Sequence, residues 1–116
     1  MSRERLLITL LVVFMTAAFA VQAVEIRPSA DIGGLKTAID GAKNGDVILL
    51  DRGKVYYGQA TMDINVNITI KADDSKAGRK PIIAPLVKQD GTVDKYMMLV
   101  RANLTCINIH FHAGIT

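Results

Sequence analysis

The sequence predicts an all-β fold in which short strands follow a coiled path. After the first 23 residues, one short amphipathic helix precedes five extended segments, and no second helix separates them. A sheet of βαβ units needs a crossover helix between neighbouring parallel strands, so that class is excluded. An antiparallel sandwich stays open, although Asp90-Gly91 is the only two-residue hairpin signal in the connections between the extended segments. Ile48 and Ile68 recur at the short end of the spacing of about 20 to 50 residues that is typical of solenoids.

The amino terminus has the features of a secretory signal. Two arginines precede an apolar run at 6–20, and Val21-Gln22-Ala23 supplies small residues for cleavage. Cleavage after Ala20 is an alternative. A membrane span needs about 20 residues, so the shorter run favours cleavage over anchoring. We assign 1–23 to a signal peptide and expect a secreted, periplasmic or cell-surface protein that meets a membrane only through this peptide during export.

The chain after the signal is long enough for one small domain. Its formal net charge falls from +3 to +2 once the signal is removed, and no basic cluster marks a nucleic-acid partner. Cys106 is the only cysteine, so no intrachain disulfide forms and stability has to come from packing. The chain has three tyrosines, three phenylalanines and no tryptophan, so composition predicts no sugar-stacking platform.

The segment 29–44 predicts a short helix with one buried side. Leu35, Ala38, Ile39 and Ala42 recur at helical spacing and form one apolar stripe. Gly45 suits the left-handed residue that ends a helix. We therefore interpret 24–45 as a cap whose helix needs a tertiary partner.

The extended segments predict short strands. Residues 47–50 are four apolar residues in a row, which requires cover on both faces. Residues 64–71 alternate strictly and predict one strand with a single buried face. Short apolar segments follow at 81–85 and 96–100. The last predicted strand is 104–111, in which we expect Ile107, Ile109 and Phe111 to share a face.

These features occur in an order that resembles a known family. The residues that carry the resemblance are Leu35, Ala38, Ile39, Ala42, Gly45, Asp46, Val47, Ile48, Leu49, Leu50, Gly53, Tyr56, Ile68, Thr69, Ile70, Lys80, Pro81, Ile82 and Ile83. Their order is similar to the amino-terminal cap and first coil of right-handed parallel β-helix proteins of the pectate lyase superfamily. Within it, the resemblance is to chondroitinase B and alginate lyase-like enzymes and to secreted bacterial β-helix proteins of unassigned role. The turn 53–56 and an insertion at 87–95 depart from the family pattern.

The resemblance implies a fold and a role. It implies a right-handed parallel β-helix in which the helix is a lid over 47–50 and 46–116 form only the first coils. Because solenoids need about three repeats, we expect a longer protein or a truncated gene product. The implied function is the non-catalytic start of a secreted, lyase-like protein that acts on polysaccharides, with calcium a candidate cofactor of the full-length protein. The alternative is a non-catalytic secreted or surface module for glycan binding or structure.

No catalytic, cofactor-binding or metal-binding residue is assigned. The family's proton-abstracting groups lie on later coils, so Lys71 and Arg101 are interpreted as solvated charges. His110 and His112 lie two apart, with Cys106 and Asn108 at the same parity, and Cys106 is a third ligand in principle. Because a zinc site needs three or four ligands, we interpret the pair as plain surface on the outer face of a strand.

Two further motifs are interpreted as ordinary surface. The Asp73-Asp74 pair resembles calcium ligands weakly, and a solvated turn explains it better. Asn67-Ile68-Thr69 and Asn103-Leu104-Thr105 match the glycosylation acceptor pattern, which matters only in a eukaryotic secretory route.

Overall fold

The computed structural model describes residues 23–59, 61–93 and 96–112, so the predicted signal lies outside the described residues except for Ala23. The described residues contain one helix and nine short strands. In chain order they are β1 (Glu25–Ile26), α2 (Gly34–Gly41), β2 (Val47–Leu50), β3 (Val55–Gly58), β4 (Met62–Ile64), β5 (Ile68–Ala72), β6 (Ile82–Pro85), β7 (Met98–Val100), β8 (Leu104–Ile107) and β9 (His110–Phe111).

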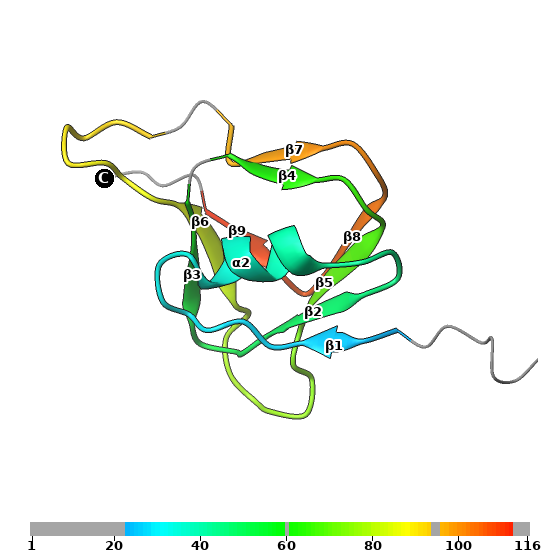
Figure 1. The fold of residues 1–116 in the computed structure, drawn as a ribbon. Helices are drawn as coiled ribbons and strands as arrows, with labels where there is room; N and C mark the ends of the chain where they lie inside the picture. The colour runs from blue at the N-terminus through cyan, green and yellow to red at the C-terminus, as the bar shows by residue number, and fades with distance from the viewer. Residues whose placement is uncertain (1–22, 60, 94–95, 113–116) are drawn as a thin grey trace, which may run out of the picture.

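The strands form three sheets, and every strand pair in them is parallel. The orders are β1-β2-β5-β8, β3-β6-β9 and β4-β7. The strands β2, β3 and β4 belong to three different sheets, and β5, β6 and β7 return to the same three in the same order (Figure 1). The fold is therefore mainly β with parallel strands, as predicted, and the antiparallel sandwich is excluded.

Side-chain amides link the turns that precede three of the four strands of the first sheet. The backbone N–H of Asn67 donates to Oδ1 of Asn44 at 2.8 Å, and the N–H of Asn103 donates to Oδ1 of Asn67 at 2.9 Å. These three asparagines, which we call the asparagine ladder, precede β2, β5 and β8. The amide oxygens of Asn44 and Asn67 thus accept hydrogen bonds from backbone N–H groups that lie in turns, outside the strand ladders. In the register of this sheet Ile48 pairs with Ile70, which is 22 residues further along the chain.

Two predicted strands are each divided in the structure. The alternating segment 64–71 ends one strand at Ile64 and starts another at Ile68, and these strands lie in different sheets. The segment 104–111 is likewise split into β8 and β9, because Asn108 has a left-handed backbone with φ of 56°. Strands β3 and β4 were not predicted.

The prediction that Ile107, Ile109 and Phe111 share a face is wrong. Ile107 pairs with Lys71 on the outer face of the first sheet and is 43% exposed. Ile109 packs against the core. Phe111 pairs with the buried Ile83 in another sheet.

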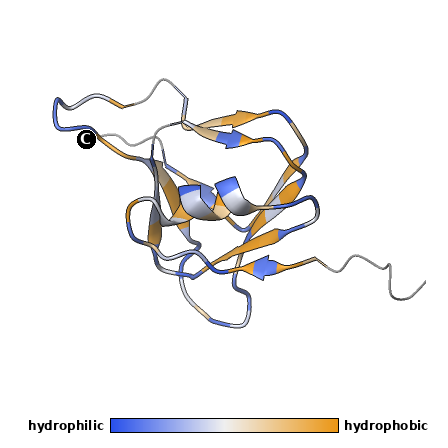
Figure 2. Cartoon of the chain, viewed as in Figure 1, coloured by the Kyte–Doolittle hydropathy of each residue, from blue (hydrophilic) through white to orange (hydrophobic). Residues whose placement is uncertain are grey.

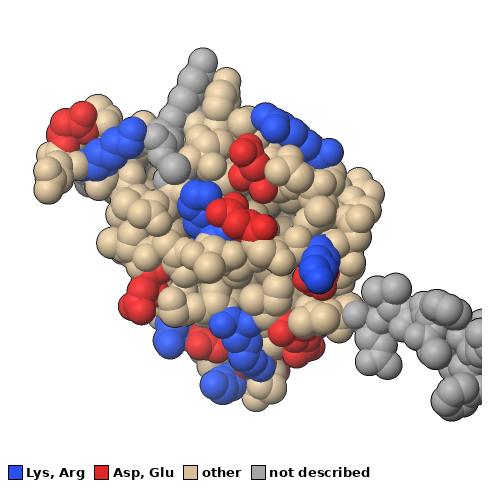
Figure 3. Space-filling model, viewed as in Figure 1, with Lys and Arg blue, Asp and Glu red and all other residues tan. Residues whose placement is uncertain are grey.

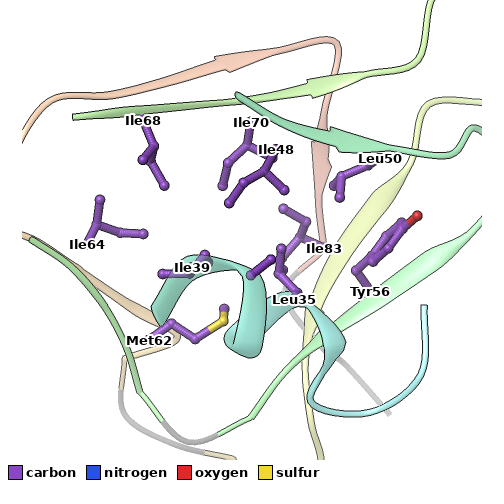
Figure 4. Close-up of a cluster of buried hydrophobic side chains, with 11 residues drawn as sticks. Leu35, Ile39, Ile48, Leu50, Tyr56, Met62, Ile64, Ile68, Ile70 and Ile83 are labelled. Atoms are coloured by element: carbon purple, nitrogen blue, oxygen red, sulfur yellow. The ribbon is translucent and has the colours of Figure 1, made fainter. Parts of the chain in front are cut away.

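The helix α2 covers one end of the space that the three sheets surround (Figure 1). Leu35 and Ile39 are buried and point from the helix toward Ile48, Ile70 and Ile83 (Figure 4). The apolar stripe predicted for this helix is therefore confirmed, with Ala42 only partly buried. Burying a large apolar side chain contributes about 1.5 to 3 kcal/mol. The helix is thus anchored by its side chains.

The four apolar residues of β2 are covered from both faces, as the sequence required. Ile48 and Leu50 are fully buried in the central cluster. Leu49 points the other way and is only 6% exposed. Figure 2 shows apolar colouring along this strand.

Two glycine positions explain how the chain enters and leaves the helix. Gly45 has φ of 90°, as expected for a left-handed residue, but the helix ends earlier, at Gly41, so Gly45 turns the chain into β2. At Gly34 a Cβ atom would overlap the carbonyl oxygen of Ser29. The loop before the helix is therefore too tight for any side chain at this position.

Candidate functional site

Two adjoining grooves lie on the outer face of the β3-β6-β9 sheet. One has a volume of about 330 Å³ and is lined by Val55, Tyr57, Ile82, Ala84, Pro85, Val87 and His112. The other has a volume of about 350 Å³ and is lined by Arg79, Lys80, Ile82 and His110. Because the two grooves share Ile82, they form one continuous surface, which we call the outer strip.

Strand alternation decides which side chains reach the outer strip. Tyr56 and Ile83 are fully buried in the core, so their neighbours in β3 and β6 point outward. Tyr57 is 37% exposed as a result. The hydroxyl of Tyr56 also accepts a hydrogen bond from the backbone N–H of Asp51 at 2.9 Å, which holds β3 in place.

The two histidines are held on the outer strip by backbone hydrogen bonds. The N–H of His110 donates to the carbonyl of Pro81 at 3.0 Å, and the N–H of His112 donates to the carbonyl of Ile83 at 2.9 Å. Their rings stack with centroids 6.3 Å apart and planes inclined by 30°. Both side chains are exposed.

Cys106 does not join the histidines, contrary to the parity argument from the sequence. It pairs with Ile70 in the first sheet, and the positive φ of Asn108 breaks the alternation before His110. The thiol is free and exposed at the end of its sheet, and desolvation raises its pKa. A raised pKa keeps the thiol protonated near neutral pH, so it is a poor nucleophile.

The outer strip is basic at one end and aromatic at the other. Arg79 and Lys80 are exposed and lie beside His110, whereas Tyr57 and His112 line the second groove. Among the residues that the structure describes, no acidic side chain lines either groove. A surface of this kind can bind an anion next to a flat apolar group.

The other predicted basic candidates lie elsewhere. Lys71 is in β5 of the first sheet, and Arg101 lies in the turn between β7 and β8, so neither belongs to the β3-β6-β9 sheet of the outer strip. The structure does not bring them together with Arg79 and Lys80. The interpretation of Arg101 as a solvated charge agrees with its exposure.

The Asp73-Asp74 pair is not simply a solvated turn. Asp73 is 3% exposed, and its carboxylate accepts hydrogen bonds from Arg27 Nη1 at 2.8 Å, from the Ser75 N–H at 2.9 Å and from Ser75 Oγ at 2.6 Å. Asp74 is exposed and pairs with Arg52 at 2.7 Å. The Asp73 oxygens are thus occupied within the chain, which leaves them unsuited to calcium.

The Asp73 carboxylate gives stability a dependence on pH. Hydrogen bonds from Ser75 and Arg27 hold the pKa of Asp73 far below its ordinary value. Because the folded-state pKa is depressed, this contribution to stability is present above the unfolded pKa of about 4 and is lost as the pH falls toward the folded pKa. We expect the melting temperature of the wild type to fall below about pH 4.

The variant Asp73→Asn tests this dependence, with Asp74→Asn as the matched control. The first variant should melt at a lower temperature than the wild type at pH 7, and the difference should shrink toward pH 2. The control should follow the wild-type profile. Parallel profiles for Asp73→Asn and the wild type would contradict the assignment.

A third groove, of about 760 Å³, lies beside α2 and the segment before it. Its polar side chains have mixed charge, since Lys36 pairs with Asp40 at 2.7 Å and Arg27 is engaged by Asp73. Figure 3 shows basic and acidic side chains interspersed on this face of the molecule. The groove therefore presents no charge of a single sign to a ligand.

Among the described residues, no group of three or more His, Cys, Asp or Glu side chains could hold a metal ion. No helix in the described ranges is long and apolar enough to cross a membrane.

Comparison with known proteins gave no family. No protein-family model matches the chain, and no curated protein matches it. The function is therefore argued from the geometry above.

Proposed function

We propose that this chain is the amino-terminal, non-catalytic part of a secreted right-handed parallel β-helix protein that acts on polysaccharides. The outer strip is the observation that carries the proposal, because it places basic and aromatic side chains along one sheet. The rotation of the chain through three parallel sheets and the helix over one end support the proposed fold. In this proposal 46–116 are the first coils, and catalytic groups lie on later coils.

An anionic polysaccharide fits the chemistry of the outer strip. Arg79 and Lys80 can pair with carboxylate or sulfate groups, and a guanidinium can do so through two parallel hydrogen bonds. The ring of Tyr57, next to His112, offers an apolar face to a sugar ring. Both grooves are shallow surface features on a regular sheet, which suits a long polymer better than a small enclosed ligand.

A non-catalytic glycan-binding or structural module is the second candidate. It is favoured by the absence, among the described residues, of a buried acid or base that lines the outer strip. The two candidates make the same prediction for binding and differ only in whether later coils contain catalytic groups.

Binding to anionic polymers tests the proposal. We expect the chain to be retarded in affinity gels that contain polygalacturonate, alginate or chondroitin sulfate, and not in gels that contain a neutral glucan. Tyr57→Ala and the double variant Arg79→Ala/Lys80→Ala should each weaken binding about tenfold, equivalent to about 1.4 kcal/mol. An absorbance assay should detect no unsaturated product.

Arg101→Ala provides the control, because it removes one exposed cation from the turn between β7 and β8, outside the outer strip. It should leave the retardation nearly unchanged. Failure of the wild type to bind any of the three polymers would refute the proposed function. Equal weakening by Arg101→Ala would show that binding depends on net charge and not on the outer strip.

A further inference from the structure

The histidine pair on the outer strip has an arrangement that suits a metal ion. His110 and His112 lie two residues apart on one strand face, where side chains emerge about 6.6 Å apart along the strand. Their backbone N–H groups are both bonded to the neighbouring β6 segment, at 3.0 Å and 2.9 Å. The two Cα atoms are therefore fixed relative to each other before any ligand binds.

Both imidazoles are free to act as ligands. They contact each other, and among the described residues no hydrogen bond or ion pair engages either ring. Both are exposed, so an ion can reach them. A ligating nitrogen is thus available without breaking an existing interaction.

The separation of the rings is compatible with one shared ion. A metal–nitrogen bond of about 2.0 Å places the ring centroid about 3.2 Å from the metal, so two rings on one ion lie between about 4.5 Å at a right angle and about 6.4 Å in line. The observed separation of 6.3 Å lies within this interval, but the rings are stacked and not in line, so both side chains have to rotate to direct a nitrogen at one ion. Rotation of the exposed side chains brings the rings closer without moving the strand.

We propose that His110 and His112 form a two-ligand site for a divalent transition-metal ion, with Cu²⁺ bound most tightly. Imidazole is a good ligand for Cu²⁺, Ni²⁺ and Zn²⁺, and the ordinary order of affinity places Cu²⁺ first. Water completes the coordination, since the chain offers no third His, Cys, Asp or Glu ligand among the described residues. This differs from a structural zinc site, which needs four ligands.

The neighbouring cations limit the affinity. Arg79 and Lys80 line the same groove as His110 and repel a metal ion. Their charges are exposed and are screened by salt over about 8 to 10 Å, so they weaken the site without abolishing it. We expect a dissociation constant in the micromolar range, about 1 to 50 μM.

Titration of the full, untagged chain with Cu²⁺ alone, followed by electron paramagnetic resonance, tests the site. At pH 7.5 we expect one ion per chain with nitrogen couplings from two imidazoles. His110→Ala and His112→Ala should each weaken binding at least about tenfold and leave couplings from one imidazole. Both residues are exposed, so the melting temperatures of the metal-free variants should equal that of the wild type.

Cys106→Ser is the control for metal binding by the thiol. This variant should bind Cu²⁺ with the wild-type affinity. The proposal is overturned if either histidine variant keeps the wild-type affinity. It is also overturned if Cys106→Ser abolishes binding, or if the wild type binds no stoichiometric ion below 100 μM Cu²⁺.

Discussion

Ile39→Asp should destabilise the chain more than any other substitution considered above. Ile39 is 4% exposed and lies in the central cluster between α2 and the sheets (Figure 4). An aspartate there would be a buried charge without a partner, and the free energy of unfolding should fall by about 3 to 5 kcal/mol. Thermal unfolding followed by circular dichroism should show a melting temperature lower by at least about 12 °C.

Thr37→Asp is the matched control, because it introduces the same side chain on the exposed side of α2. Thr37 is exposed and loses only its hydrogen bond to the carbonyl of Gly33. Its effect should stay within about 1 kcal/mol. If Ile39→Asp melts like the parent, the helix does not cover the core, and the interpretation of α2 as a lid is wrong.

Self-association at the β7-β8-β9 end is the second large effect that we expect. Each of these strands is the last in its sheet, and no described residue pairs with its free edge. Val100 and Ile107 are 51% and 43% exposed. Unpaired strand edges with apolar side chains are templates for pairing with another chain. Light scattering of residues 24–116 should therefore show a mean mass that rises with concentration to at least twice that of the monomer.

Ile107→Glu should reduce this association strongly. A charge on an edge strand opposes pairing with another chain, and the new carboxylate would lie beside Lys71, with which Ile107 pairs across the sheet. Val93→Glu is the control, since Val93 is 42% exposed but lies in a loop. A monodisperse wild-type monomer at all concentrations would contradict the expectation of an open edge.

The helix and the buried strand could be predicted because their patterns are local. The stripe formed by Leu35, Ala38 and Ile39 has helical spacing, and the structure buries all three. The run 47–50 required cover on both faces and is indeed covered. In both cases the residues that form the pattern are close in sequence, within two turns of one helix or within one strand.

The corners between sheets could not be predicted from alternation. Ile64 and Ile68 both point into the core although a three-residue turn separates them, because the interior stays on the same side of the chain as it passes from one sheet to the next. The apolar pattern therefore continues through the corner without interruption. Asn67, which forms the asparagine ladder, was the available signal, but the sequence interpretation gave it only a glycosylation motif.

The outer strip could not be predicted because register creates it. Tyr57, Lys80 and His112 come from three separate segments, and only the parallel pairing of β3, β6 and β9 places them on one face. Composition predicted no sugar-stacking platform, because a count of aromatic residues cannot show that one of the three tyrosines lines a groove together with a histidine. The sequence spacing predicted that the histidine pair and Cys106 lie on the same face of one strand. In the structure the left-handed backbone of Asn108 places them in different sheets.

The asparagine ladder has a consequence for where this chain can change in length. The turns at 65–67 and 101–103 each contain three residues and end in a ladder asparagine, so an added residue there would displace a bonded amide and every strand that follows. No asparagine of the ladder lies in the segment between β6 and β7. Paired residues of the first sheet are 22 positions apart from Val47 to Thr69 and 36 positions apart from Thr69 to Thr105. Most of this difference in length comes from the segment between β6 and β7. Insertions acquired in evolution, or an epitope added in the laboratory, belong in that segment.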